Sequence, residues 1–247
     1  MRKKNEYKDL KGQQKFLIQS KNDFRITNLA EFVYKKLPVK KGKVLDVGVG
    51  NGYLLSYFQK KGFETAGYEY DKELVSLLNS KDDTRWLNIK EGDITKLSGN
   101  AQYDVVVCTD VIEHIKDDQK AVKNLYSFVK PGGILVIGVP AFQFLYGKRD
   151  VMWGHYRRYS KSRLLNKVHN LKGKLLFTSY WNMLGFFGYF FFEKILRRTI
   201  YDTYRKNNRP WSRLLRALFN LELKVEKMIG WVPFGLTLFV FFKKEKS

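Results

Sequence analysis

The chain of 247 residues is 44% hydrophobic and 16% aromatic, which excludes a disordered protein and allows one substantial buried core. Its formal net charge of +22 favours an anionic partner, such as nucleic acid, an acidic membrane surface or a phosphate-bearing substrate. A single cysteine, Cys108, excludes an intrachain disulfide and a multi-cysteine zinc site, and with only three histidines we expect no metal centre.

Strands and helices alternate along the first 140 residues. Apolar side chains at helical spacing predict a helix over residues 24–37, which stops before Pro38. Apolar runs bounded by glycine or polar residues predict strands at 43–47, 63–69, 86–90, 103–108 and 134–139. The intervening segments with helical spacing are 53–61, 71–78 and 117–129. Because parallel strands are joined by helical crossovers, this order predicts an α/β fold with a Rossmann-like, doubly wound and mostly parallel sheet.

The C-terminal part adds two strands and an insert. Ser160 is placed to cap a helix that reaches about Val168, and strands at 174–180 and 236–242 would complete a seven-stranded sheet. Roughly fifty residues separate these two strands, far more than compact domains usually need. We therefore expect a single domain over 1–247 with five consecutive parts: an N-terminal helical extension (1–40), a ligand-binding core (41–140), a loop with the sixth strand (141–180), a basic aromatic helical insert (181–233) and the last strand (234–247).

A glycine-rich loop, Asp46-Val-Gly-Val-Gly-Asn-Gly52, follows the first predicted strand. It lies at the edge where a doubly wound sheet binds its ligands. Glycines there let a ligand approach the backbone, and the helix that follows presents its N-terminal amides. A dinucleotide fingerprint would place its third glycine at position 53, where this chain has Tyr53. The loop therefore favours a nucleotide-like ligand other than NAD.

From this loop on, residues 40–140 resemble the class I S-adenosylmethionine-dependent methyltransferase superfamily. Five short motifs carry the resemblance in the family's order: Asp46–Gly52, Gly67–Glu69, Gly92-Asp93-Ile94, Cys108–Ile115 and Pro131–Ile137. The resemblance implies S-adenosylmethionine as the cofactor and methyl transfer as the activity.

The resemblance also implies which residues hold the methionine end of the cofactor. Asp46 steadies the loop, and Gly48, Gly50 and Gly52 pass under the methionine part. Asp110 belongs to the segment after the fourth strand, which lies beside the methionine in this superfamily.

The nucleoside end is assigned in the same way. Glu69 matches the acid that holds both ribose hydroxyls, which suits a carboxylate because it can accept from two adjacent hydroxyls. Tyr70 lies along the adenine. Asp93 accepts from the exocyclic amine, and the Ile94 amide faces a ring nitrogen.

The segment after the fifth strand is interpreted as the acceptor-binding loop. Its run Gly154-His-Tyr-Arg-Arg-Tyr159 resembles one found in some bacterial and archaeal methyltransferases linked to cell-envelope glycans or lipids. We therefore expect a small, glycan- or lipid-linked acceptor, bound by His155, Tyr156, Arg157 and Tyr159. For a hydroxyl acceptor, His155 would be the catalytic base with Asp110 behind it. Glu113 and His114 are interpreted as structural.

The basic residues concentrate toward the C-terminus. From Lys148 on there are 22 Lys and Arg against 6 Asp and Glu, a net of +16, whereas the first 147 residues carry 24 against 18, a net of +6. The insert combines the aromatic run Tyr180–Phe192, too short to span a bilayer, with arginine-rich helices on both sides of Pro210. Such helices suit the plane of an anionic membrane, so we expect peripheral membrane association. No apolar run follows the basic start Met1–Asp9, so we expect a cytoplasmic protein without a secretory signal.

Three alternatives stay open. The aromatic face of the insert could pack on the sheet or on a partner chain. The basic region could instead grip the phosphates of RNA, which would make the protein an RNA methyltransferase. A methyltransferase fold can also serve as the scaffold of a non-catalytic adaptor.

Overall fold

The computed structural model of the chain describes residues 24–197, 214, 217–218, 220–222, 224–225 and 232–246. The first 23 residues of the expected N-terminal extension lie outside the described residues. About half of the expected insert, including residues 198–213 on both sides of Pro210, lies outside them as well.

Seven strands form one sheet. They are β1 (Gly42–Val47), β2 (Phe63–Glu69), β3 (Ile89–Glu91), β4 (Tyr103–Thr109), β5 (Val129–Pro140), β6 (Gly173–Trp181) and β7 (Thr237–Lys244). Their order across the sheet is β3-β2-β1-β4-β5-β7-β6. The neighbours from β3 to β5 are parallel, whereas β7 runs antiparallel between β5 and β6. The predicted Rossmann-like, mostly parallel seven-stranded sheet is thereby confirmed.

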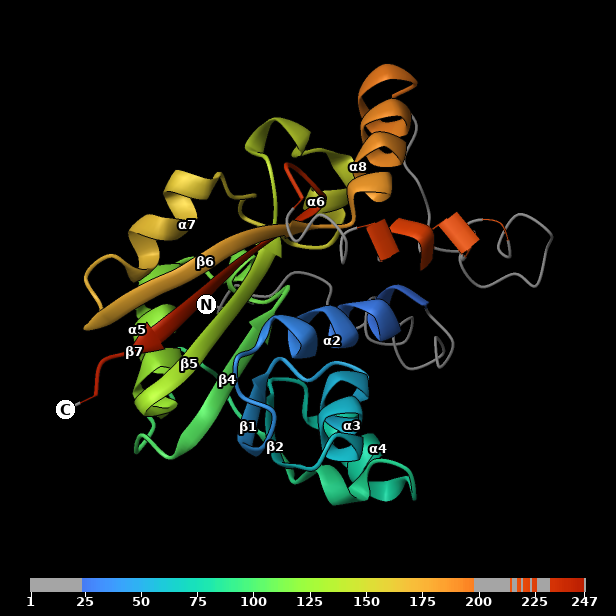
Figure 1. Ribbon diagram of the computed structural model, residues 1–247. Coiled ribbons are helices and arrows are strands. Elements are labelled where there is room, and N and C mark those ends of the chain that lie inside the picture. Colours follow the sequence, from blue (N-terminus) through green and yellow to red (C-terminus); the bar gives the residue numbers. More distant parts are fainter. Residues whose placement is uncertain are drawn as a thin grey trace, which may run out of the picture.

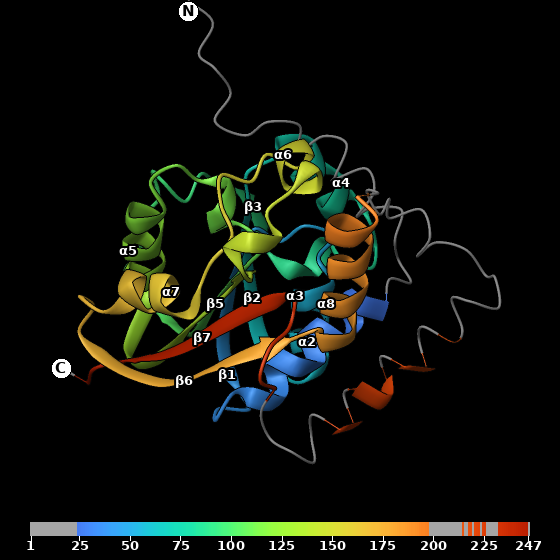
Figure 2. The same ribbon diagram turned by 90° about the horizontal axis from the view of Figure 1, so that it is seen from above.

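Helices cover both faces of this sheet. The α-helices are α2 (Phe24–Lys36), α3 (Tyr53–Lys60), α4 (Lys72–Ser80), α5 (Asp118–Phe128), α6 (Lys148–Met152), α7 (Lys161–Val168) and α8 (Met183–Tyr189). Shorter helical segments are η1 (Arg85–Leu87), η2 (Ile112–His114), η3 (Gln143–Leu145) and the π-helix η4 (Phe190–Ile195). Helices α2 and α3 lie on one side of the sheet, and α5 and α7 lie on the other (Figure 2).

Alternate side chains of the central strands fill two separate cores. On β1, Val44 belongs to the core shared with α2, α3 and α4, whereas Leu45 belongs to the core shared with α5 and α7. On β4, Val105 and Val107 join the first core and Cys108 joins the second. A strand buried on both faces needs apolar residues at consecutive positions, which explains the continuous apolar run of β4. Cys108 is therefore a small core residue.

Three elements differ from the sequence-based expectation. Trp86 and Leu87 lie in the turn η1, and the third strand begins only at Ile89. The reason is local: Asn88 has a φ of 51°, outside the range of a strand. Strand β5 begins earlier than predicted, because Val129 already pairs with β4 before the register shifts. The segment expected to be a loop after β5 contains the helix α6.

The carboxyl ends of the parallel strands point to one edge of the sheet, where a site can form. Helix α6 lies beyond the carboxyl end of β5, and α8 projects away from the sheet beside it (Figure 1). The Glu222 carboxylate accepts hydrogen bonds from the Met183 and Leu184 amides at the start of α8. Among the residues that the structure describes, no helix is long and apolar enough to cross a membrane.

Candidate functional site

The loop between β1 and α3 depends on glycine. Gly48 has a φ of +85°, and a Cβ there would lie 2.2 Å from Cγ2 of Val111, in the segment that follows β4. Gly50 and Gly52 have φ values of +57° and +77°, which L side chains rarely adopt. The Gly48 amide donates to the Tyr68 carbonyl at 2.8 Å and so holds the loop against β2. The bare backbone forms a cradle that a ligand can approach closely.

Glu69, at the end of β2, is tied to this loop. Its Oε2 accepts from the Gly50 amide at 3.0 Å, and its Oε1 accepts from the Asp71 amide at 3.2 Å. Burial raises the pKa of Glu69, and these backbone hydrogen bonds oppose the rise. A carboxylate offers about four acceptor positions, so Glu69 keeps acceptor capacity for a ribose hydroxyl beside its backbone partners.

Asp46 supplies the test of whether the predicted cofactor fits. Its Oδ1 is buried and has no hydrogen-bond partner among the described residues. Burial raises the pKa of Asp46 well above its ordinary value, and Glu69 adds to the rise. A buried acceptor without a partner is costly unless a ligand brings a donor. The orphaned carboxylate and the glycine cradle therefore fit S-adenosylmethionine, which carries an ammonium and two ribose hydroxyls.

Asp93 follows β3 at the same edge of the sheet. Its Oδ1 accepts from the Thr95 amide at 2.9 Å and from the Thr95 hydroxyl at 2.7 Å, and its Oδ2 lies 3.3 Å from Nζ of Lys96. Burial raises the pKa of Asp93, but these contacts outweigh burial and leave the pKa below its ordinary value. Asp93 is thus a fixed, ionised acceptor, which suits the predicted recognition of an amine.

The remaining predicted cofactor residues occupy neighbouring strand ends. Tyr70 is 41% exposed just after β2, as a residue that lies along a ligand requires. The Ile94 side chain is buried in the core, so only its backbone is left for the predicted contact with adenine. Asp110 has a φ of 53°, and its amide donates to the Gly138 carbonyl at 3.0 Å. Their contacts with a cofactor stay predictions.

Asp150 in α6 is the centre of the segment predicted to bind the acceptor. Its Oδ1 lies 2.8 Å from Nδ1 of His155 and accepts from Nε of Arg158 at 2.8 Å. Its Oδ2 accepts from the Gly147 amide at 3.0 Å and from the Tyr189 hydroxyl at 3.2 Å. Burial raises the pKa of Asp150, but the hydrogen bond with His155 and the charge of Arg158 outweigh burial and lower it to about 2. An ionised, buried aspartate therefore joins the loop to α8.

This geometry corrects the partner predicted for His155. The carboxylate that orients the imidazole is Asp150, whereas the sequence analysis placed Asp110 behind it. The spacing of Gly147 and Asp150 could have indicated that Asp150 lies at a helix start. An acid three residues after the residue that caps a helix accepts a hydrogen bond from the amide of that capping residue. The contact between Asp150 and His155, which are five residues apart, gives no such signal, because the contact depends on how the chain turns after α6.

Two of the predicted acceptor-binding residues have other partners. Tyr159 is 0% exposed and donates to Oδ2 of Asp118 at 2.8 Å, so it is a core residue and not, as predicted, a contact for the acceptor. Arg157 lies 2.8 Å from the same carboxylate and donates to the Lys116 carbonyl at 3.0 Å. Tyr156 is 44% exposed, which keeps it accessible to an acceptor. Asp118, which the sequence analysis did not single out, anchors this loop to α5.

Glu113 lies between two histidines at the end of β4. Its Oε1 is 4.0 Å from Nε2 of His114 and 4.0 Å from Nε2 of His155. The two imidazole rings meet edge to face, with centroids 4.6 Å apart. Burial, followed by the charge of Asp110, raises the pKa of Glu113 well above its ordinary value. Burial and the facing His155 lower the pKa of His114 to about 3.

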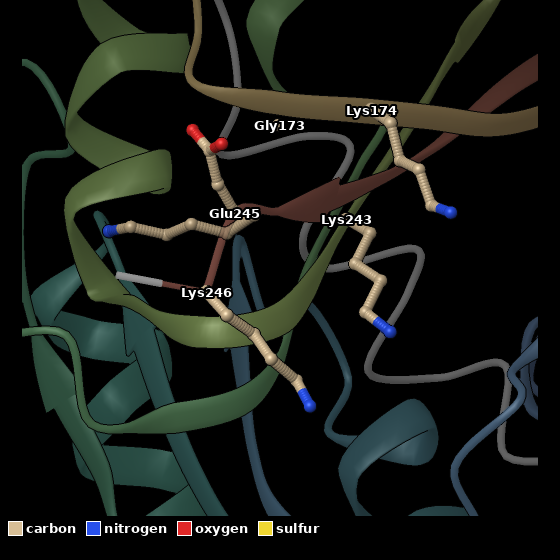
Figure 3. Close-up of a pocket in the computed structure, with 6 residues that line it drawn as sticks. Gly173, Lys174, Lys243, Glu245 and Lys246 are labelled. Carbon is tan, nitrogen blue, oxygen red and sulfur yellow. The ribbon is translucent and has the colours of Figure 1, made fainter.

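A separate cavity of about 330 Å³ lies at the opposite end of the sheet, beside the start of β6 and the end of β7. Its lining is basic: Gly173, Lys174, Lys243, Lys244, Glu245 and Lys246. The labelled lysine side chains run roughly parallel and do not converge on one point (Figure 3). We therefore do not assign a binding site to it.

Known proteins resemble this chain in sequence and in fold. A family model described as "Methyltransferase domain" matches residues 21–173. A ubiquinone biosynthesis O-methyltransferase from Coxiella burnetii is 32% identical over 108 residues, which are 42% of this chain and 46% of that protein. The chain thus matches less than half of the length of this relative.

Solved structures extend the likeness over nearly the whole chain. A putative methyltransferase in complex with the Trm112 activator, from Haloferax volcanii, has a TM-score of 0.63 and 18% identity, with 96% of both chains covered. A Haemonchus contortus N-methyltransferase bound to phosphomonomethylethanolamine and S-adenosylhomocysteine has a TM-score of 0.56 and 17% identity, covering 89% of this chain and 53% of that one. At such identities the likeness shows the fold alone.

Proposed function

Because this chain belongs to the methyltransferase-domain family, within the class I S-adenosylmethionine-dependent superfamily, we propose that it methylates a hydroxyl group of a small, glycan- or lipid-linked acceptor. The likeness to an O-methyltransferase supports oxygen as the acceptor atom. The resemblance of Gly154–Tyr159 to envelope-linked methyltransferases supports the class of acceptor.

The observation that carries the proposal is a continuous path from the cofactor loop to a buried imidazole. Val111 packs against Gly48 so closely that a Cβ on the glycine would clash with it. Two residues later, the Glu113 carbonyl accepts from the Tyr156 amide at 2.8 Å, and its carboxylate faces His155. The cofactor cradle and His155 are thus joined through one short segment after β4.

Each group has a role in this proposal. S-adenosylmethionine, when bound, supplies an electrophilic methyl group on its sulfonium. The glycine cradle, Asp46 and Glu69 hold the cofactor, and positioning supplies much of the acceleration in such a displacement. His155 is the catalytic base, which accepts the proton of the acceptor hydroxyl. Asp150 is the positioning residue that orients the imidazole ring of His155.

The α8 apolar surface supports a membrane location for the acceptor. We define it as the exposed side chains Leu184, Phe187, Phe190, Phe191, Phe192, Ile195 and Leu196. Apolar side chains gathered on a projecting helix, within a C-terminal part of net charge +16, suit the plane of an anionic membrane. The same charge would suit RNA, which is the second candidate acceptor.

The proposal is tested by separating cofactor affinity from turnover. We expect His155→Ala to leave S-adenosylmethionine affinity nearly unchanged and to lower turnover by at least about tenfold, the low end for a general acid or base. The matched control is His169→Ala, because His169 is exposed at the end of α7. Radiolabelled cofactor with separated lipid, glycan and RNA fractions identifies the acceptor. Unchanged turnover in His155→Ala, or labelling of RNA alone, contradicts the proposal.

A further inference from the structure

Three buried polar atoms of η2, in the segment after β4, have no hydrogen-bond partner among the described residues. They are Oε1 and Oε2 of Glu113 and Nδ1 of His114, and no described residue satisfies them. The Glu113 side chain is 0% exposed, so water does not compensate its carboxylate from the surface. Unpaired buried groups are costly, and in native proteins they point to a ligand or ion. The same cluster was interpreted as structural from the sequence.

The donor atoms of this cluster are spaced for a shared ion. Glu113, His114 and His155 each contribute one ligand atom, and these atoms all lie within 4.8 Å of one another. Tetrahedral coordination with bonds of about 2.0–2.2 Å to nitrogen and oxygen places two donors roughly 3.3–3.6 Å apart. Oε1 of Glu113 lies 4.0 Å from Nε2 of each histidine, so the three side chains would close on a bound ion by about half an ångström.

The surroundings of the cluster are those of a metal site. A metal-binding histidine almost always donates its other ring N–H to a carboxylate, a backbone carbonyl or a water, which fixes its orientation. Nδ1 of His155 has this partner in Asp150, which leaves Nε2 directed at Glu113. The acids Asp110 and Asp150 act electrostatically on Glu113, and the charge of Arg158 opposes them only in part, so the surroundings of Glu113 favour a cation.

We infer that Glu113, His114 and His155 form a binding site for one divalent transition-metal ion of the zinc type. Two imidazoles and one carboxylate are a ligand set of catalytic zinc sites, and this chemistry disfavours magnesium, which prefers oxygen ligands. The inference departs from the sequence-based expectation of no metal centre. That expectation rested on the small number of histidines, but the fold brings two of the three together.

The ion would join the segment after β4 to the segment after α6. Its role in the reaction, which is to bind the acceptor hydroxyl, rests on the proposed function. An oxygen bound to such an ion loses its proton at a lower pH than it does in water. His155 would then act as a ligand of the ion and not as a free base.

The experiment measures metal binding directly on the full chain. After removal of metals with a chelator, the protein is titrated with Co²⁺, followed by its visible absorption, and with Zn²⁺ by calorimetry. We expect one ion per chain, displacement of Co²⁺ by Zn²⁺ and a higher melting temperature with the ion bound. Glu113→Gln and His155→Ala should each weaken Zn²⁺ binding by at least about 100-fold, and Asp150→Asn by roughly 10- to 100-fold.

His169→Ala is the control and should bind Zn²⁺ as the unaltered chain does. Because this variant keeps all three proposed ligands, it also provides a test that does not depend on the folding of the ligand variants. X-ray absorption of the Zn²⁺ complex of His169→Ala should show two imidazole ligands, which only His114 and His155 can then supply. No stoichiometric binding by the unaltered chain, or no imidazole in that spectrum, overturns the inference.

Failure of this inference and failure of the proposed function are distinguishable. Metal binding is measured without methyl transfer, so a chain that binds one Zn²⁺ but transfers no methyl group contradicts only the proposed function. Full activity in metal-free protein contradicts only the role of the ion in the reaction, and His155 then acts as the base.

Discussion

At the scale of single residues, Gly48 is the most constrained position of the cofactor loop. We expect Gly48→Ala to lower the free energy of unfolding by about 2–4 kcal/mol, because it combines a positive φ with a clash against Val111. The control is Gly62→Ala, which has a φ of +87° but nothing within 4 Å of its Cβ and should lose only about 1 kcal/mol. Denaturant unfolding compares the two, and equal losses would show that the contact with Val111 is unimportant.

Asp118 makes a pH-dependent contribution to stability. Burial raises the pKa of Asp118, but hydrogen bonds from Lys167, Tyr159 and Arg157 outweigh burial and leave the pKa below its ordinary value. A lowered pKa in the folded state means that the ionised group stabilises the fold above pH about 4, and that this stabilisation is lost as the pH falls further. At neutral pH we expect Asp118→Asn to lose roughly 3 kcal/mol, as for a broken buried ion pair.

The measurement is denaturant unfolding of both proteins from pH 7 downward. The difference between them should shrink as the pH falls below about 4. Asp82→Asn is the control, because the Asp82 side chain is 92% exposed and its ion pair with Arg85 should contribute little. If the difference in the free energy of unfolding between Asp118→Asn and the unaltered chain does not change with pH, the stabilising role assigned to the ionised Asp118 is contradicted.

Single residues also mark the limit of what the sequence predicts about the site. Asp46, Gly48 and Glu69 could be placed because a glycine loop and the end of the next strand are neighbours in any doubly wound sheet. Asp150 could not be placed, because its contact with Arg158 and His155 depends on the path of the chain after α6. Tyr159 was misassigned because an aromatic residue in a basic segment looks the same whether it is buried or exposed.

At the scale of elements, α8 and η4 carry the surface that we propose for membrane contact. We expect the double variant Phe187→Ser and Phe191→Ser to lower binding to anionic vesicles by at least about tenfold. Burying an exposed phenylalanine side chain in the membrane would contribute roughly 2 kcal/mol to the binding free energy. Trp86→Ser is the control, because Trp86 is exposed in η1, at the far edge of the sheet.

Co-sedimentation with phosphatidylserine-containing vesicles measures this effect, beside an RNA mobility shift across a salt series. Equal vesicle binding by the double variant and the unaltered chain would show that α8 does not contact the membrane. Retention by RNA alone, with a steep dependence on salt, would favour the second candidate acceptor.

The elements themselves were largely predictable, for a physical reason. Strands such as β4 are buried on both faces and therefore read as continuous apolar runs, and the helices α3 and α5 end shortly before a glycine or a proline. The start of β3 was not predictable, because Asn88 leaves the strand conformation without any glycine or proline to mark it. Helix α6 was missed because five residues are too few for a periodic signal.

At the scale of the whole molecule, the order of the strands is what places the site. The alternation of strands and helices predicts a parallel sheet, but it does not predict that β7 lies between β5 and β6. That insertion makes β7 antiparallel to both of its neighbours. It also brings the segment before β7 back to β6, where the Leu236 amide donates to the Asn182 carbonyl at 3.1 Å.

The roles of the glycine loop, Asp46 and Glu69 all depend on the cofactor, and calorimetry with S-adenosylmethionine tests them most directly. We expect the full chain to bind one molecule, and Glu69→Ala to weaken binding by at least about tenfold through loss of the ribose contacts. Glu73→Ala, on the neighbouring helix α4, should bind as the unaltered chain does. Absence of any binding heat with the cofactor at millimolar concentration would contradict these roles.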